Sequence, residues 1–379
     1  MSLHVLVLAG GGGTRLWPLS RAGRPKHLLP LGPGGSTLLR ATVERVRDLG
    51  DSLTVVTTAD QAAACADELH DLIDAGDVLA EPVARGTGPA LGLATALLAQ
   101  RDPEALITSV HADSSVGDDD AYRAAVLASA GWARTSGGLA TVGLQPTGPA
   151  TGFGYIEVGE RLDAAAWQEP SPGPASELRG AAADLAAFSA VRLVEKPDFE
   201  TAVAYVDGGR HLWNLGLFSW PARTLLEELH DADAGLAAGV DEAARALAAG
   251  EAGRAGEVYA ALRTVAVEPL VFERTHRLCV VRAAFPWSDL GSWADLHASR
   301  VEAGEADADG NVIDGDALVI GANDTTVESR GGRLVAVAGV DDLVVVDTPE
   351  ALLVVSQADS QRVKEIVERL RAQGRTELL

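Results

Sequence analysis

A run of glycines followed by cations makes the N-terminal part of the sequence suitable for binding phosphates. The segment Leu8-Ala9-Gly10-Gly11-Gly12-Gly13-Thr14-Arg15 follows an apolar run, and Pro25-Lys26 comes shortly afterwards. Glycines let backbone N–H groups close on phosphate oxygens without interference from a Cβ atom. A P-loop is excluded because the chain has no Gly-Lys pair, and a dinucleotide fingerprint fails because Leu16 stands where a small residue is needed. A plain turn between a strand and a helix is the alternative.

The scarcity of lysine singles out two positions. The chain holds 28 arginines but only three lysines, Lys26, Lys196 and Lys364. The first two adjoin prolines, in Arg24-Pro25-Lys26 and Glu195-Lys196-Pro197. Lysine carries a compact charge on a flexible stem, which a planar guanidinium does not reproduce. We therefore expect functional roles for Lys26 and Lys196, and a solvated Lys364 on an amphipathic C-terminal helix.

The charge distribution favours a small polyanion as ligand. The net charge is −23, yet the first acidic residue is Glu44, and it is preceded by Arg15, Arg21, Arg24, Lys26 and Arg40. A strongly acidic chain offers no broad basic face for a nucleic-acid backbone. One basic, glycine-rich corner suits a nucleoside triphosphate.

Neither a membrane span nor a secretion signal is expected. No apolar run approaches the roughly 20 residues that cross a bilayer, and the start lacks a basic region and a cleavage site. The two cysteines, Cys65 and Cys279, lie far apart without ligand spacing. They indicate two buried thiols in a reduced, cytoplasmic protein.

Strands and helices must alternate to position these residues. Strand-like runs are expected at 4–9, 53–57, 105–110 and 139–144, and helices through Val43 and Val46 and at 62–73, 88–100 and 122–135. This alternation predicts an α/β fold with a doubly wound, mostly parallel, Rossmann-like sheet and helices on both faces. Ligands of such sheets bind beyond the carboxyl ends of the strands, and Asp113 follows one of these runs closely.

The pattern changes beyond an acidic linker at 303–310. Short β-type runs follow at 317–320, 325–328, 334–337, 343–346 and 352–355, and a closing helix carries Val363, Ile366, Val367 and Leu370 on one face. We expect a catalytic domain over residues 1–302 and a small β-rich domain over 311–379, in which stacked strands would form a few β-helix coils. The segment Ala164–Ala183 is rich in Ala, Pro, Ser and Glu, and is expected to be an exposed insertion without a catalytic role.

Taken together, these segments resemble the sugar-phosphate nucleotidylyltransferase family. Residues 8–26 resemble its signature, Gly-Gly-x-Gly-x-Arg-Leu-x-Pro-Leu followed by Pro-Lys, and Trp17 resembles the variant found in the mannose-1-phosphate guanylyltransferase branch. The resemblance implies that Arg15 and Lys26 hold the β- and γ-phosphates. Phosphoryl-type transfer is mostly positioning and charge neutralisation, so the residue types lead to the same roles. The implied nucleotide-binding residues of this segment are Leu8, Ala9, Gly10, Gly11, Gly13 and Thr14.

The segment Glu81-Pro82-Val83-Ala84-Arg85-Gly86-Thr87 resembles the base-reading segment of the family, which implies that Glu81, Pro82, Gly86 and Thr87 bind the nucleotide. A carboxylate only accepts hydrogen bonds. Guanine presents N1–H and its exocyclic amine side by side, whereas thymine and uracil present one donor between acceptors. Glu81 therefore predicts GTP, and an exposed loop glutamate is the alternative. Gly86 stands where the branch usually has asparagine.

Two aspartates are implied as metal ligands. His111-Ala112-Asp113-Ser114 occupies the place of the family motif Pro-Ala-Asp-His, and Trp287-Ser288-Asp289-Leu290-Gly291-Ser292-Trp293 resembles the motif Trp-x-Asp-x-Gly-Ser-Trp. The resemblance implies that Asp113 and Asp289 bind Mg²⁺, a hard cation that takes one or two carboxylates together with substrate phosphates. A helix cap is the alternative role for Asp289.

Three further segments imply a site for the sugar phosphate. They are Thr151-Gly152-Phe153-Gly154-Tyr155-Ile156-Glu157, Val194-Glu195-Lys196-Pro197 and Trp213-Asn214-Leu215-Gly216-Leu217-Phe218, and each resembles a motif of the family. The resemblance implies that the backbone at Gly154 lies against the sugar. Glu195 would accept bonds from its hydroxyls, Lys196 would contact its phosphate and Asn214 would bind through its amide. A turn cap is the alternative for Asn214.

The sequence thus predicts transfer of GMP from GTP to α-D-mannose 1-phosphate, which gives GDP-mannose and pyrophosphate. The second pKa of a phosphate monoester is about 6, so the nucleophile is already ionised and a direct in-line attack needs no general base. The expected partners are small molecules, and the β-rich tail could form a homodimer. Three alternatives stay open: another sugar 1-phosphate or nucleotide, a non-catalytic subunit that binds a sugar nucleotide, and a nicotinamide-dependent oxidoreductase.

Overall fold

The computed structural model describes residues 1–11, 13–170 and 175–379, so Gly12 of the glycine run and residues 171–174 of the expected insertion lie outside the described residues. The chain forms two compact units. The first comprises Met1–Ala9, Thr42–His111 and Asp118–Phe285, and the second comprises Gly10–Ala41, Ala112–Gly117 and Pro286–Leu379. The units do not divide the chain at a single point, and the domain boundaries at 302 and 311 stay a prediction.

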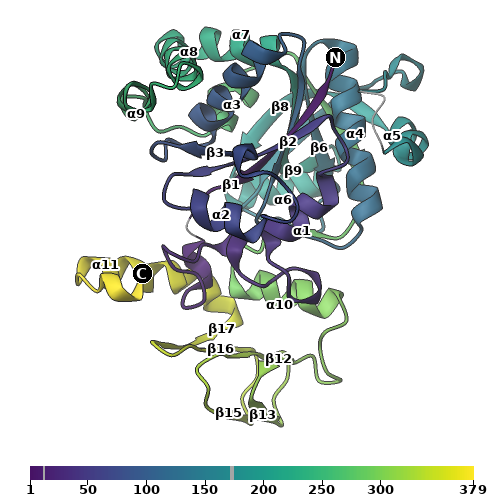
Figure 1. Cartoon of the computed structure of the whole chain (residues 1–379). Helices are drawn as coiled ribbons and strands as arrows, with labels where there is room; N and C mark the ends of the chain where they lie inside the picture. The colour runs from purple at the N-terminus through teal and green to yellow at the C-terminus, as the bar shows by residue number, and fades with distance from the viewer. Residues whose placement is uncertain (12, 171–174) are drawn as a thin grey trace. The chain divides into compact units, whose positions relative to one another are not determined.

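The first unit is built on a sheet to which the described residues contribute nine strands, in the order β3-β2-β1-β4-β9-β6-β10-β8-β7 (Figure 1). One half is parallel: β1 (Leu3–Ala9) lies between β2 (Ser52–Thr58) and β4 (Leu106–His111), and β3 (Val78–Glu81) flanks β2. β1, β2 and β4 are mostly buried, as parallel strands covered on both faces require, whereas in β3 only Glu81 is buried. Their carboxyl ends share one edge of the sheet, where Glu81 ends β3.

The other half of the sheet is mixed. Its strands are β9 (His211–Pro221), β6 (Leu139–Leu144), β10 (Leu278–Ala283), β8 (Ala187–Glu195) and β7 (Gly154–Arg161). β6 and β10 are parallel, but β9 runs antiparallel to β4, β6 and β7, and β8 runs antiparallel to β7 and β10. The α/β Rossmann-like class with its mostly parallel sheet is confirmed, and among the described strands of this sheet β8 and β9 are the two that run opposite to the others. A buried strand shows the same apolar pattern whichever way it runs, so the pattern does not encode direction.

Helices cover both faces of this sheet (Figure 1). Leu6 and Leu8 of β1 share a hydrophobic core with α3, α7 and α8, whereas Val5 and Val7 point to the opposite face because side chains alternate along a strand. α4 packs against β4, β6, β9 and β10. The expected helices are present, although α2 ends earlier than position 73. The α-helices are α2 (Ala62–Glu68), α3 (Thr87–Arg101), α4 (Asp119–Ser136), α5 (Arg179–Asp184), α6 (Phe199–Gly208), α7 (Ala222–Ala232), α8 (Ala234–Ala248) and α9 (Ala252–Ala260).

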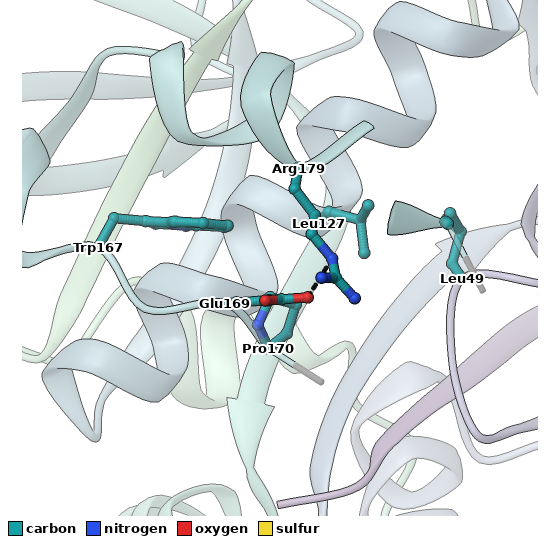
Figure 2. Close-up of a pocket in the computed structure, with 7 residues that line it drawn as sticks. Leu49, Leu127, Trp167, Glu169, Pro170 and Arg179 are labelled. Carbon is teal, nitrogen blue, oxygen red and sulfur yellow. Dashed lines mark ion pairs between the residues drawn. The ribbon is translucent and has the colours of Figure 1, made fainter. Parts of the chain in front are cut away.

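The described part of the expected insertion is only partly exposed, which corrects the prediction. Trp167 Nε1 donates to the carbonyl of Ala128 on α4 at 3.2 Å, and Arg134 Nη1 donates to the carbonyl of Glu169 at 2.6 Å. Figure 2 shows the pocket beside these contacts, where Glu169 and Arg179 form an ion pair. The aromatic ring of Trp167 and the guanidinium of Arg134 hold the segment on the helix. None of the predicted site residues line this pocket.

The second unit combines the glycine-rich segment with the C-terminal region. Strands β12, β14 and β16 form a parallel ladder that β17 extends antiparallel, and β13 and β15 form a second parallel ladder. Two parallel ladders are typical of β-helix coils. Each expected β-type run is present, and β12 is an additional short strand. The elements are α1 (Leu38–Val46), which ends in the first unit, β5 (Ser115–Val116), β11 (Trp287–Ser288), α10 (Trp293–Glu302), β12 (Val312–Gly315), β13 (Ala317–Ile320), β14 (Thr326–Ser329), β15 (Val335–Ala338), β16 (Leu343–Asp347), β17 (Leu352–Ser356) and α11 (Val363–Ala372).

Two tryptophans anchor the glycine-rich segment within the second unit. Trp293 Nε1 donates to the carbonyl of Trp17 at 3.1 Å, and Trp17 Nε1 donates to the carbonyl of Leu378 at 2.8 Å. Both rings are buried in a core that also contains Leu16 and Val363. The tryptophans of the two sequence motifs therefore fix the segment that carries Arg15 and Lys26 to the turn that carries Asp289.

Two smaller expectations concern thiols and membranes. Cys65 and Cys279 are buried free thiols, as predicted. Within the described ranges, no helix combines the length and the apolar character needed to cross a bilayer.

Candidate functional site

Lys26 lies between the two predicted metal-binding aspartates in the second unit. Its Nζ donates to Asp113 Oδ2 at 2.9 Å and also to the main-chain carbonyl of Asp289. Only 6% of Lys26 is exposed, and a buried ammonium group is stable only when it is paired. β5 and β11 pair with Ser115 opposite Ser288, which brings the residues next to them side by side. The structure therefore brings together three residues from three distant segments.

A tight turn places the Asp289 carboxylate. Its Oδ1 accepts a hydrogen bond from the N–H of Gly291 at 3.1 Å, and Leu290 between them has a φ of 46°, in the left-handed region that non-glycine residues rarely adopt. Burial raises the pKa of Asp289, and the charges of Lys26 and Arg15 act in the opposite direction. The helix-cap alternative is wrong, because Ser292 caps α10.

The donor set of this cluster fits a hard divalent cation. Asp113 and Asp289 offer carboxylate oxygens, and the side chain of Asp113 is 38% exposed. In the part of the chain that the structure describes, no group of three or more His, Cys, Asp or Glu residues is arranged to hold a metal. A pair of carboxylates is what Mg²⁺ uses when substrate phosphates and water complete its shell. The residues present thus match a metal that binds together with its substrate.

The glycine-rich segment packs directly on Lys26. Gly13 has a φ of 54°, and a Cβ atom there would lie 2.3 Å from the Cβ of Lys26. The Ser20 hydroxyl donates to the Gly13 carbonyl at 2.7 Å. Arg15 is exposed, and its Nη1 donates to Gln361 Oε1 at 3.3 Å. Glycine at 13 is therefore required for the close approach of the segment to the lysine. The other predicted residues of the segment divide between the units: Gly10, Gly11 and Thr14 belong to the second, and Leu8 and Ala9 end β1 in the first.

Glu81 is buried in the first unit, which rules out the exposed loop glutamate. Only 7% of the residue is exposed. Its Oε2 accepts a hydrogen bond from the Tyr259 hydroxyl at 2.6 Å, and the carboxylate also accepts one from the N–H of Arg85. Burial raises the pKa of Glu81, and these two hydrogen bonds act in the opposite direction. The contribution of Tyr259 to this site was not predicted from the sequence, because the tyrosine lies within a helix and belongs to no motif.

The backbone conformation requires glycine at position 86. Gly86 has φ 82° and ψ 172°, a conformation essentially restricted to glycine. A Cβ atom there would lie 2.6 Å from the carbonyl oxygen of Val265. The neighbouring Thr87 accepts a hydrogen bond from the N–H of Val267 at 2.9 Å through its hydroxyl. The segment that begins with Glu81 and Pro82 is thus held against residues 265–267, at a distance that excludes a side chain at position 86.

Gly154, Glu195 and Asn214 meet on three neighbouring strands of the first unit. Gly154 on β7 is paired with Glu195 on β8 and with Asn214 on β9. A Cβ atom on Gly154 would lie 2.2 Å from Glu195 Oε2, so the carboxylate lies over the glycine. Asn214 Oδ1 accepts hydrogen bonds from the N–H of Gly216 at 3.2 Å and from the Thr141 hydroxyl at 3.3 Å. The amide oxygen of Asn214 is therefore engaged within the protein.

Glu195 occupies an electrostatically unfavourable position. Burial, with the nearby Glu268 and Glu273, raises the pKa of Glu195 to about 7, although Lys196 Nζ lies 3.7 Å from its carboxylate. Glu195 Oε2 is buried and has no hydrogen-bond partner among the described residues. Lys196 is 66% exposed at its side chain and has a φ of 50°. A strongly shifted pKa beside a backbone outlier is typical of a functional site.

We predict that Glu195→Gln stabilises the protein above pH 7. The pKa is raised from 4.5 to about 7 in the folded state, so the folded state binds a proton that the unfolded state has lost, and stability falls as the pH rises through this window. The shift corresponds to at most about 3 kcal/mol in the free energy of unfolding. Because the side chain is 26% exposed and solvent screens its charge, we expect removal of the charge to raise the free energy of unfolding by about 2 kcal/mol. Thermal unfolding should show the gain at pH 8 and not at pH 4.5. Equal gains at both values would contradict the prediction, and the exposed Glu160→Gln is the control.

The predicted site residues thus form three groups. Arg15, Lys26, Asp113 and Asp289 lie in the second unit with most of the glycine run. The base-reading segment and the group around Glu195 lie in the first. Convergence of Lys196 with Lys26 stays a prediction.

Comparisons with known proteins cover almost the entire chain. A family model described as nucleotidyl transferase matches residues 4–305, and one described as a MannoseP isomerase/GMP-like beta-helix domain matches residues 307–370. The mannose-1-phosphate guanylyltransferase of Escherichia coli K12 is 35% identical over 99% of this chain and 75% of its own length. The xanthan biosynthesis protein XanB of Xanthomonas campestris pv. campestris (strain ATCC 33913) is 32% identical over 98% of this chain and 74% of its own. A crystal structure described as mannose-1-phosphate geranyltransferase from Thermus thermophilus has a TM-score of 0.78 at 31% identity, and the match covers 98% of this chain and 100% of that one.

Proposed function

Because the chain belongs to the nucleotidyl transferase family, and within it to the group of the mannose-1-phosphate guanylyltransferases, we propose that it transfers GMP from GTP to α-D-mannose 1-phosphate. The products are GDP-mannose and pyrophosphate. The observation that carries this proposal is the position of Lys26, a buried cation paired with Asp113 and bonded to the Asp289 backbone beside a glycine-rich segment. This arrangement supports charge neutralisation on a triphosphate.

The reaction is a direct in-line displacement. An oxygen of the sugar phosphate forms a bond to the α-phosphorus of GTP, and the bond from that phosphorus to the oxygen bridging to the β-phosphate breaks. The sugar phosphate is mostly ionised at neutral pH, since its second pKa is about 6. No side chain has to remove a proton or form a covalent intermediate, so the task of the protein is to position two anions and to neutralise their charge.

Two cations and two carboxylates act on the phosphate groups of GTP. Arg15 and Lys26 neutralise the charge on the departing pyrophosphate. Asp113 and Asp289 would hold Mg²⁺, which supplies further neutralisation of phosphate oxygens when bound. Gly13 packs against Lys26, so that the N–H groups of Gly13 and Thr14 can bind the same phosphates as the lysine.

Base and sugar are selected by residues of the first unit. Glu81 accepts the N1–H and amine donors of guanine. Glu195 accepts hydrogen bonds from sugar hydroxyls, for which its unpartnered Oε2 is suited. The Asn214 amide donates to the sugar, and Lys196 pairs with the sugar phosphate. The cost of keeping Glu195 ionised in its buried position is offset by these ligand contacts.

A substrate panel tests the proposal. Purified protein with Mg²⁺ is given GTP, ATP, UTP or dTTP, each with mannose, glucose or heptose 1-phosphate, and pyrophosphate release is measured. We expect the highest kcat/KM for GTP with mannose 1-phosphate. A higher value for another pair would replace the assigned substrates, and tight binding of GDP-mannose without any turnover would indicate a non-catalytic subunit. Binding of NAD would instead favour an oxidoreductase.

We predict that Lys196→Ala raises the KM for mannose 1-phosphate by about tenfold or more, with a smaller change in the KM for GTP. The lysine is exposed, so its removal leaves packing intact, and loss of a charged phosphate contact is worth about 1.5–3 kcal/mol. Steady-state kinetics with each substrate varied in turn measures the two effects. Arg161→Ala removes another exposed cation from the same unit as a control. Equal losses for both substrates would refute the assigned role.

Two further predictions belong with this proposal. We expect a cytoplasmic location and a homodimer. Light scattering on the purified protein tests the second expectation.

A further inference from the structure

The Tyr259 hydroxyl is hydrogen-bonded to the carboxylate predicted to read the base. Tyr259 lies near the end of α9 and is fully buried. Its hydroxyl donates to Glu81 Oε2 at 2.6 Å across 178 positions of sequence. Burial together with the neighbouring Glu81 raises the pKa of Tyr259, so the hydroxyl stays protonated and acts as a donor. The hydrogen bond is therefore charge-assisted and fixes one carboxylate oxygen.

We propose that Tyr259 is a positioning residue for nucleotide selection, which orients the Glu81 carboxylate so that it accepts both donors of guanine. This inference rests on the proposed function and extends it to a residue with no family motif. Tyr259 contacts no substrate in this scheme. It acts through Glu81 alone.

The number of acceptor positions on Glu81 agrees with this role. An ionised carboxylate has about four lone-pair positions. The Tyr259 hydroxyl and the Arg85 N–H use two of them. Two remain, which matches the two adjacent donors on guanine, N1–H and the exocyclic amine. Without the tyrosine hydroxyl the carboxylate could rotate and lose this pairing.

The segment that carries Tyr259 is also bonded to the base-reading segment. The Arg85 guanidinium donates to the carbonyl of Ala260. Val265 and Arg85 form a backbone hydrogen bond of 3.0 Å, and the N–H of Val267 donates to the Thr87 hydroxyl at 2.9 Å. Residues 259–267 and 85–88 are thus held together at several points, so the tyrosine keeps a constant position relative to Glu81.

A purely structural role is the competing explanation. In that case the hydroxyl would only tie α9 to the end of β3. Its removal would lower stability but would change the use of all nucleotides by the same factor. Base discrimination separates the two explanations, because only orientation of Glu81 affects one base more than another.

The experiment compares GTP with ITP, which keeps N1–H but lacks the exocyclic amine. In the wild type, the ratio of kcat/KM for GTP to that for ITP should be well above one. In Tyr259→Phe we expect this ratio to fall by about tenfold, as for one well-oriented hydrogen bond to a charged group. An unchanged ratio would overturn the inference. Tyr122→Phe removes the hydroxyl of another buried tyrosine in the same unit and should leave the ratio unchanged.

A double variant covers the case in which Tyr259→Phe alone does not fold. Glu81→Gln removes the buried charge that the tyrosine serves, so Tyr259→Phe combined with Glu81→Gln leaves no unpaired carboxylate. If Tyr259 acts only through Glu81, the double variant should have the same GTP-to-ITP ratio as Glu81→Gln. A further fall would overturn the inference. Failure of the wild type to use GTP would refute the proposed function instead, so the two failures are distinguishable.

Discussion

Replacing Lys26 with methionine is expected to lower kcat by about a thousandfold. The charge of Lys26 is held beside Asp113 and the backbone of Asp289, and removal of a preorganised group that stabilises transition-state charge costs about 10²–10³ in rate, or more when it neutralises a transferring phosphoryl group. Methionine keeps the apolar stem in the same buried space, so the effect should appear in catalysis more than in folding. Pyrophosphate release and thermal unfolding, measured on the same preparation, separate the two.

Two controls sharpen this prediction. Lys364→Met removes an exposed lysine that is paired with Glu368 on α11, and it should leave kcat unchanged. Lys26→Arg should be nearly as inactive as Lys26→Met, because a planar guanidinium does not fit the buried position of a compact ammonium. Retention of more than about a tenth of kcat in Lys26→Met would show that this cation does not neutralise the leaving group.

Asp113→Asn and Asp289→Asn are each expected to lower kcat by about 10²–10³. The amide keeps the shape of the side chain but removes the charge that holds a divalent cation. Because burial raises the pKa of Asp289, its neutral replacement should not destabilise the fold. Mn²⁺ binding in the presence of GTP, followed by electron paramagnetic resonance, gives a readout that is independent of turnover. Both variants should bind Mn²⁺ more weakly than the wild type.

The matched control for these aspartates is Asp316→Asn, which removes an exposed carboxylate from the second unit. It should change neither kcat nor Mn²⁺ binding. If Asp289→Asn lost activity while it bound Mn²⁺ as the wild type does, Asp289 would not be a metal ligand. Its effect would then have to come from the turn that it forms with Gly291.

Residue composition predicted the part of the site that uses a residue type rare in this chain. The rarity of lysine pointed to Lys26, which the structure places between Asp113 and Asp289. The alternation of apolar runs predicted β1, β2 and β4 and the helices between them, because buried strands and amphipathic helices have distinct periods. The antiparallel direction of β9 was not predicted, because the apolar pattern of a buried strand is the same in both directions.

Local sequence patterns did not predict which residues distant in sequence would contact each other. The hydrogen bond from Tyr259 to Glu81 joins a tyrosine that belongs to no motif to the first residue of the base-reading segment. Trp167 holds the segment that was expected to be an exposed insertion against α4, and nothing in the composition of that segment indicates its partner. The positive φ of Lys196 follows from the fold around it, although lysine itself disfavours that conformation.

The most direct test of the central claim follows the α-phosphate of GTP. An excess of the protein is mixed with GTP labelled at that phosphate, together with Mg²⁺ and with or without mannose 1-phosphate. We predict that the label passes into GDP-mannose at the same rate as pyrophosphate appears, that neither forms without the sugar phosphate, and that no label remains on the denatured protein. Label bound to the protein, or pyrophosphate formed from GTP alone, would contradict direct transfer.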